Sequence, residues 1–150
     1  MKKADIPLVF ERLSAADPTP QTELVFTNTF TLLVAVVLSA QATDKGVNKA
    51  TEALFRKADS PEKMAALGEA RIRDYIKTIG LYRNKAKNVF ALSVMLRDQF
   101  DSVVPQDRAT LMSLPGVGRK TANVVMNKAF SEATFAVDTH VFRLSNRTGL

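Results

Sequence analysis

The sequence predicts an all-α protein, and three observations support that prediction. Apolar residues recur at helical spacing along nearly the whole 150-residue chain. Residues that cap or break helices separate these stretches into short segments. The nearest candidate for a β-strand, 133–137, is too short to be convincing. We therefore expect helices around a common core, in a chain long enough for one domain or for one domain and a fragment.

The first part of the chain predicts one amphipathic helix and one enclosed helix. Ile6–Ala16 carries an apolar stripe and ends at the proline-containing segment 17–20. Thr29–Ala40 is apolar on nearly all sides, as expected of a helix that others surround. The most apolar run, 30–42, has about 13 residues, which is too few to cross a bilayer.

Cap signals predict three helices in the middle of the chain. Asp44 can cap a helix whose apolar stripe ends at Phe55. Ser60 followed by Pro61 predicts the start of a short helix that ends at Gly68. The next helix is marked by isoleucines and closed by Gly80. These isoleucines are Ile72, Ile76 and Ile79.

The longest predicted helix is Asn84–Phe100. Its apolar positions Val89, Leu92, Leu96 and Phe100 are expected to face inward. Lys85 and Lys87 lie near its start, and we expect them on the solvent side.

The strongest local signal is the segment 114–122, LPGVGRKTA, between two predicted helices. Asp107 is expected to cap the first helix, which extends to Leu114, and the second is Arg119–Phe130. Gly116 and Gly118 permit positive φ angles and close approach of a ligand to the backbone. The segment therefore predicts an anion site at a helix N-terminus, although a plain turn between packed helices explains it as well.

Charge supports a polyanionic partner. The chain has 21 Lys and Arg against 15 Asp and Glu, a net charge of +6. Between residues 71 and 128 there are eleven basic and four acidic residues, so the excess lies in the half that contains the glycine turn. A phosphate of DNA is the natural occupant of such a site, and it would be bound without base reading. Cysteine is absent and His140 is the only histidine, so disulfides, zinc thiolate sites, iron–sulfur ligation and histidine-rich metal sites are excluded.

Lys120 and Asp138 are the candidate reactive residues. The positive helix terminus and Arg119 both disfavour an ammonium at Lys120, and a free amine can form a Schiff base with a sugar. A solvated lysine that contacts phosphate is the alternative. Asp138 is most simply the N-cap of a last helix, and spacing alone does not bring it to Lys120.

Four motifs together resemble the endonuclease III family, the DNA glycosylases and abasic-site lyases of the helix-hairpin-helix superfamily. They are LSAQATD at 38–44, IKTIGLY at 76–82, LPGVGRKTANVV at 114–125 and AVDTHVFR at 136–143. The resemblance implies a six-helix bundle with a helix-hairpin-helix motif at 107–130, plus an incomplete second helical domain. It assigns 27–130 to the bundle, 1–26 to an N-terminal arm of the second domain and 131–150 to the start of that domain's C-terminal half.

The resemblance also implies roles for particular residues. Lys120 would attack C1′ of the sugar and displace the damaged base, and Asp138 would assist the attack and the later proton transfers. Leu81 would act as a wedge in the base stack and Gln41 would fill the gap, although a helix-capping contact and a buried amide are the alternatives. The implied DNA-binding residues are Gln41, Leu81, Gly116, Val117, Gly118, Arg119, Thr139 and His140.

The family's [4Fe–4S] cluster would need residues beyond Leu150, so we expect no metal or cofactor on this chain and impaired activity from it. The expected function is base-excision repair of oxidised pyrimidines by a bifunctional glycosylase and lyase. The expected partner is double-stranded DNA with a damaged base or abasic site, with no membrane and no obligate protein partner. The expected location is the bacterial cytoplasm, at the nucleoid. A non-catalytic helix-hairpin-helix DNA-binding module is the alternative.

Overall fold

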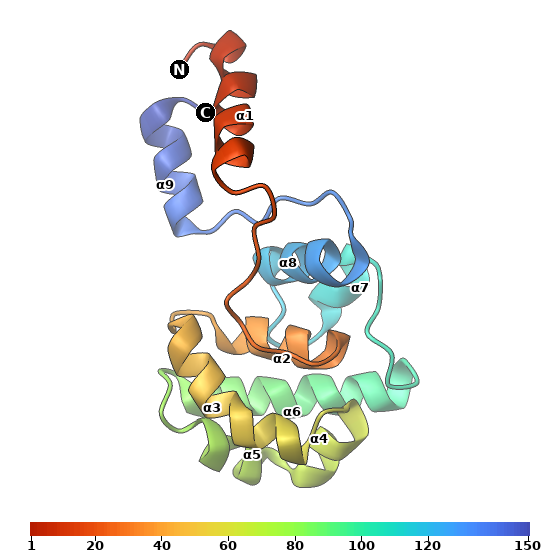
Figure 1. Ribbon diagram of the computed structural model, residues 1–150. Helices are drawn as coiled ribbons and strands as arrows, with labels where there is room; N and C mark the ends of the chain where they lie inside the picture. Colours follow the sequence, from red (N-terminus) through yellow and green to blue (C-terminus); the bar gives the residue numbers. More distant parts are fainter. The chain divides into compact units, whose positions relative to one another are not determined.

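The computed structural model describes all residues 1–150, and it is entirely helical, as predicted (Figure 1). The chain divides into two compact units, Glu23–Ala136 and a smaller one made of Met1–Thr22 with Val137–Leu150. The helices are η1 (Lys3–Asp5, a 3₁₀ turn), α1 (Ile6–Ala16), α2 (Thr29–Leu38), α3 (Asp44–Lys57), α4 (Pro61–Leu67), α5 (Glu69–Ile76), α6 (Tyr82–Gln99), α7 (Arg108–Ser113), α8 (Arg119–Phe130) and α9 (Thr139–Thr148).

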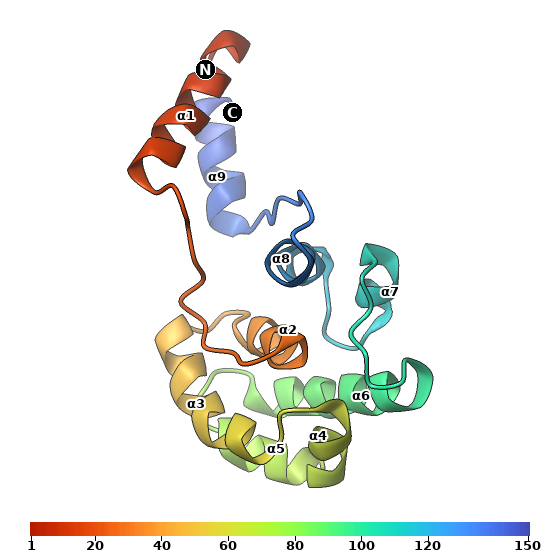
Figure 2. The same ribbon diagram turned by 45° about the vertical axis from the view of Figure 1, so that its right-hand side comes forward.

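Helix α2 is the centre of the larger unit. Every residue from Phe30 to Leu38 is buried, as its continuous apolar sequence predicts. The helix starts at a capping box, in which Asn28 accepts from the amide of Thr31 and the Thr31 hydroxyl accepts from the amide of Asn28. It packs against α8 on one side and α6 on the other, and α4 and α5 pack on α6 (Figures 1 and 2).

Most cap predictions are confirmed, and three details of the middle helices are wrong. Thr43, and not Asp44, is the N-cap of α3 and accepts from the amide of Gly46 at 3.1 Å. Helix α5 ends at Ile76, so Ile79 is buried in the turn that follows the helix. Lys85 is not on the solvent side of α6, because only 5% of it is exposed. Position 85 lies four residues before Val89 and therefore on the same buried face of the helix.

The smaller unit consists of η1, α1 and α9, and none of these helices contains a buried residue. The amino group of Met1 donates to the carbonyl oxygen of Thr148 at 2.7 Å. Large apolar side chains are exposed on both long helices, among them Leu13, Phe142 and Leu144. Helix α9 therefore has an exposed apolar face.

None of the helices combines the length and apolar composition that crossing a membrane requires.

Candidate functional site

The glycine hairpin joins α7 to α8 and is held by two buried side chains. Leu114 and Val117 are both in the core, and the amide of Val117 donates to the carbonyl oxygen of Leu114 at 3.1 Å. Between them Gly116 adopts φ +79°, a conformation that other residues rarely adopt. Gly116 and Gly118 are exposed. The apolar residues thus fix the turn while the backbone of the glycines stays open to a ligand.

The N-terminus of α8 is open to an anion. Gly118 is the N-cap and has no side chain to satisfy the first amides, whereas Asp107 accepts from the amides of Ala109 and Thr110 at the start of α7. The first helical bond of α8 runs from Ala122 N to Gly118 O at 2.9 Å, so the amides before it have no partner within the helix. Together with the helix dipole, these amides favour a bound anion such as a phosphate.

Lys120 lies in the first turn of α8, directly after the hairpin. Its side chain is exposed and takes part in none of the ion pairs of the structure. Arg119 is exposed beside it. The amine is therefore accessible to a ligand seated on the hairpin.

Gln41 and Leu81 share an unusual backbone. Both are non-glycine residues at positive φ, +54° and +57°, and both are exposed, Leu81 to 61%. Such backbone strain often accompanies binding or catalytic function. The exposure of Gln41 argues against a buried amide there. Leu81 is the N-cap residue of α6, as its alternative role predicts: its carbonyl oxygen accepts from the amide of Lys85 at 3.0 Å, and its side chain stays exposed.

The structure brings the loops that carry these residues together around the first turns of α6. A Cβ built on Gly80 would lie 3.9 Å from the backbone oxygen of Gln41, so the 41 and 80–81 loops are neighbours. Gly116 lies against Asn88 of α6, where a built Cβ would be 2.9 Å from the Cβ of Asn88. Asn88 follows Leu81 by seven residues, about 10 Å along a helix. One region of the larger unit therefore contains Leu81, Gln41 and the glycine hairpin.

Asp138, Thr139 and His140 lie at the start of α9, in the smaller unit. Oδ1 of Asp138 accepts from the amides of His140 at 3.0 Å and Val141 at 2.9 Å, which confirms that Asp138 is an N-cap. Nδ1 of His140 lies 3.9 Å from Oδ2 of Asp138. That Asp138 and Lys120 act together in one reaction stays a prediction.

Two buried polar residues were not predicted: Lys85 was expected on the solvent side, and Asn123 was not singled out. Lys85 Nζ and Asn123 Oδ1 are buried without a hydrogen-bond partner. Burial lowers the pKa of Lys85 below its ordinary value, because the charged amine is removed from water. Asn123 stands between Ala122 and Val125 in an otherwise apolar stripe of α8, and that interruption was the available signal.

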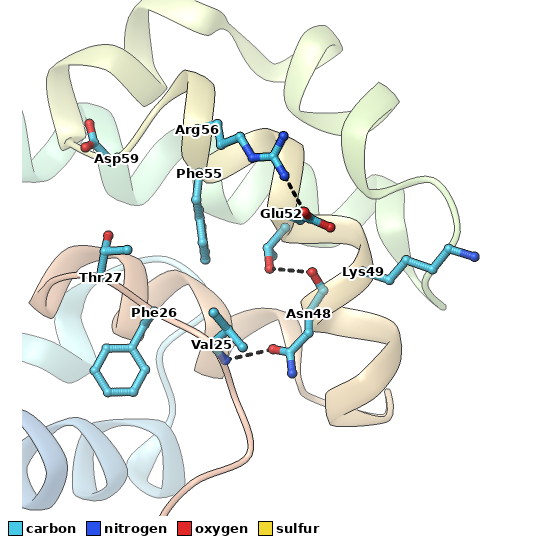
Figure 3. A pocket seen from close by; sticks show the side chains of 10 residues that line it. Val25, Phe26, Thr27, Asn48, Lys49, Glu52, Phe55, Arg56 and Asp59 are labelled. Carbon is cyan, nitrogen blue, oxygen red and sulfur yellow. Dashed lines mark hydrogen bonds and ion pairs between the residues drawn. The ribbon is translucent and has the colours of Figure 1, made fainter.

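A separate cavity of about 690 Å³ lies between the segment 25–27 and α3 (Figure 3). Val25, Phe26 and Phe55 provide apolar surface, and the Glu52–Arg56 ion pair lies at its edge. None of the predicted site residues lines it. The hairpin and its neighbours therefore remain the candidate site.

This site and the all-helical fold define a helix-hairpin-helix protein. Residues 34–150 match the family described as "HhH-GPD superfamily base excision DNA repair protein", and the chain belongs to that family. Its relatives include endonuclease III of Treponema pallidum, 61% identical over 95% of this chain and 67% of the relative. Two solved structures, a non-covalent endonuclease III–DNA complex and a trapped endonuclease III–DNA covalent intermediate, have TM-scores of 0.93 and 0.94. Each is 48% identical and matches 99% of this chain and 70% of its own.

These 150 residues do not fit an iron–sulfur cluster. Such clusters are held by cysteine thiolates, and the sequence contains no cysteine. No group of three His, Asp or Glu side chains converges in the structure to hold another metal.

Proposed function

We propose that this base-excision repair protein is a bifunctional DNA N-glycosylase and AP lyase that uses Lys120 as its nucleophile. One observation supports the proposal above all others: an exposed lysine without an ion pair stands in the first turn of a helix, next to an open anion site. A phosphate on the hairpin would hold one DNA strand beside this amine. The solved DNA complexes of endonuclease III support DNA as the partner.

The DNA contacts divide by role. The hairpin amides of 116–118 and the side chain of Arg119 bind phosphate and position the duplex without reading its sequence. A base inside a duplex must leave the stack before its glycosidic bond can be reached, at a cost of a few kcal/mol. Exposed Leu81 would enter the stack as an apolar wedge, and Gln41 would occupy the vacated space and hydrogen-bond the orphaned partner base. Thr139 and His140, exposed at the start of α9, would add contacts to the DNA backbone.

The proposed reaction begins at Nζ of Lys120. The neutral amine attacks C1′, the glycosidic bond breaks, and the base leaves with the bonding electrons and takes up a proton. The C1′–O4′ bond then breaks and opens the sugar ring: the attacking nitrogen passes one proton to O4′ and remains joined to C1′ as a protonated imine. The imine acidifies the C2′ hydrogen, whose removal expels the 3′ phosphate by β-elimination and cuts the strand. Asp138 would act as the carboxylate that assists the attack and accepts and returns protons.

One of the solved relatives is a trapped covalent endonuclease III–DNA intermediate, and it supports covalent chemistry of this kind. We also infer that the damaged bases are oxidised pyrimidines and that the chain works in the bacterial cytoplasm, at the nucleoid. These inferences come from the family, since no residue of the structure defines a base pocket.

The decisive experiment is borohydride trapping on a duplex with one abasic site. Borohydride reduces an imine to a stable amine, so even a slow single turnover leaves a covalent adduct. We expect an adduct with the wild type and none with Lys120→Ala. Lys57→Ala, an exposed lysine at the end of α3, is the matched control and should trap like the wild type. Salt-sensitive DNA binding without any adduct would instead indicate a non-catalytic helix-hairpin-helix module.

A further inference from the structure

The segment that follows α8 runs back along that helix. At the C-terminal end, the amide of Glu132 donates to the carbonyl oxygen of Met126 at 3.0 Å, and Nδ2 of Asn127 donates to the carbonyl oxygen of Glu132 at 3.1 Å. One turn earlier in α8, Nδ2 of Asn123 donates to the carbonyl oxygen of Phe135 at 3.2 Å. Successive residues of the segment therefore contact earlier positions of the helix, in the direction of Lys120.

Asn123 fastens this returning segment at two consecutive residues. The hydroxyl of Thr134 donates to the backbone oxygen of Asn123 at 2.5 Å, so one residue of α8 is bonded to two consecutive residues of the segment. Asn123 is 8% exposed and lies one turn after Lys120. Asp138 follows Phe135 by three residues, which spans at most about 11 Å of extended chain.

Asn123 is a poor choice for stability alone. Its Oδ1 is buried without a hydrogen-bond partner, and a buried polar atom without a partner is unfavourable. An apolar side chain would suit this face of α8, whose neighbours Ala122, Val125 and Met126 belong to the core. What the amide provides, and an apolar residue would not, is a bond to the backbone of Phe135.

We propose that Asn123 is a positioning residue, which fastens the 134–135 backbone to α8 and thereby limits how far Asp138, three residues further along the chain, can lie from that fastening. The proposal rests on the proposed function, because it matters for catalysis only if Asp138 and Lys120 act together. Asn123 is buried, and in this proposal it acts through Asp138. Misplacing a catalytic group by about 1 Å can cost roughly 100-fold in rate.

The test is a double-mutant cycle on the rate of base excision under single-turnover conditions. We expect Asn123→Leu to lower the rate about 10- to 100-fold while DNA affinity stays within about twofold, because the hairpin is unchanged. Asp138→Asn should lower the rate as well. Combining the two should cost no more than Asp138→Asn alone, since Asn123 then has no carboxylate to position. Losses that multiply would overturn the proposal, and so would a folded Asn123→Leu variant with the wild-type rate.

Two further variants separate positioning from general destabilisation. Thr134→Val removes the second fastening bond without changing side-chain volume much, and Thr134→Ser keeps it. We expect a slower rate with the first and rescue with the second, and this pair decides the question if Asn123→Leu fails to fold. Asn48→Leu is the matched control, because Asn48 clamps the segment 23–25 to α3 through Val25 N and Glu23 O. It should lower stability and leave the rate unchanged.

The same data distinguish failure of this inference from failure of the proposed function. If Lys120→Ala and Asp138→Asn keep the full rate, the proposed function falls and the positioning role falls with it. If both abolish excision while Asn123→Leu and Thr134→Val leave it unchanged, only the positioning role is overturned.

Discussion

Gly116 of the hairpin packs directly on Asn88 of α6. A Cβ built on Gly116 would lie 2.9 Å from the Cβ of Asn88, a distance that real Cβ atoms do not reach, and the φ of +79° disfavours any other residue. Gly118, two residues later, has φ −92° and nothing within 4 Å of a built Cβ. The fold therefore requires glycine at position 116 but not at position 118, where any requirement would come from a bound ligand.

Alanine substitutions should distinguish these two positions. We expect Gly116→Ala to lower the free energy of unfolding by about 2–4 kcal/mol, from the left-handed backbone and the collision with Asn88. Gly118→Ala should change it by less than about 0.5 kcal/mol, because a modest loss as N-cap is offset by a stiffer unfolded chain. It should nevertheless weaken DNA binding, since the methyl group stands where a phosphate approaches. Urea unfolding and DNA titration of both variants test this, and equal destabilisation would contradict it.

Leu81 is expected to be strained in the free protein. Its φ of +57° costs a non-glycine residue about 1–2 kcal/mol, and its side chain gains little from packing at 61% exposure. Leu81→Ala keeps the backbone strain and Leu81→Gly removes it. The glycine variant should therefore unfold at a higher urea concentration than the alanine variant. Its free energy of unfolding should be greater by up to about 1 kcal/mol, once the entropy cost of glycine is included. Both variants lose the wedge, and both should excise a paired damaged base more slowly. An alanine variant as stable as the glycine variant would show that the backbone is not strained.

Local chemistry made much of the fold predictable. The limits of α1 and α8 agree with the prediction to the residue, because Pro18 and the glycine hairpin leave the chain few alternatives. Ser60 and Asp107 were also predicted correctly as N-caps, because serine and aspartate side chains readily accept from the first amides of a helix. Thr43 was missed because Asp44 beside it is an equally good cap by residue type, and only the backbone decides between them.

Tertiary and backbone features were beyond local prediction. The burial of Lys85 depends on which face of α6 meets the core. Because lysine is charged, we predicted that it would lie on the solvent-facing side of the helix. The positive φ of Gln41 and Leu81 has no signal in the sequence, because residues that adopt it readily are absent from both positions. The return of the segment 132–135 along α8 depends on hydrogen bonds between side chains and backbone that spacing does not reveal.

Lys85 should make stability depend on pH. Burial lowers its pKa in the folded state, whereas in the unfolded chain it titrates near its ordinary value of 10.5. Between these two values the unfolded state binds more protons, so the free energy of unfolding rises with pH. We expect Lys85→Met to be more stable than the wild type at neutral pH, with an advantage that shrinks as pH approaches 10.5. Lys87→Met, exposed on the same helix, should follow the wild type at every pH in urea unfolding. An advantage that does not change with pH would contradict this account.

Asp138→Asn should separate the capping role from the catalytic one. Asparagine caps a helix about as well as aspartate, so the bonds to the amides of His140 and Val141 can remain. Loss of the charge at the helix N-terminus should cost less than about 1 kcal/mol. The rate of base excision should nevertheless fall at least about 100-fold, as expected when a carboxylate that transfers protons is neutralised. DNA affinity, measured by titration, should stay within about twofold. A folded variant with the wild-type rate would remove Asp138 from the mechanism.

Helix α9 should be among the least protected helices of the chain. It contains no buried residue, and Phe142 and Leu144 are exposed, whereas α2 is buried from Phe30 to Leu38. Local opening is cheap where few apolar contacts must be broken, so we expect amides of α1 and α9 to exchange with deuterium long before those of α2 and α6. The exposed apolar face should also promote self-association at high concentration. Phe142→Ser should reduce that association in sedimentation without changing exchange in α2. Protection of α9 equal to that of α2 in a dilute monomer would contradict the prediction, because it would require a core that the smaller unit lacks.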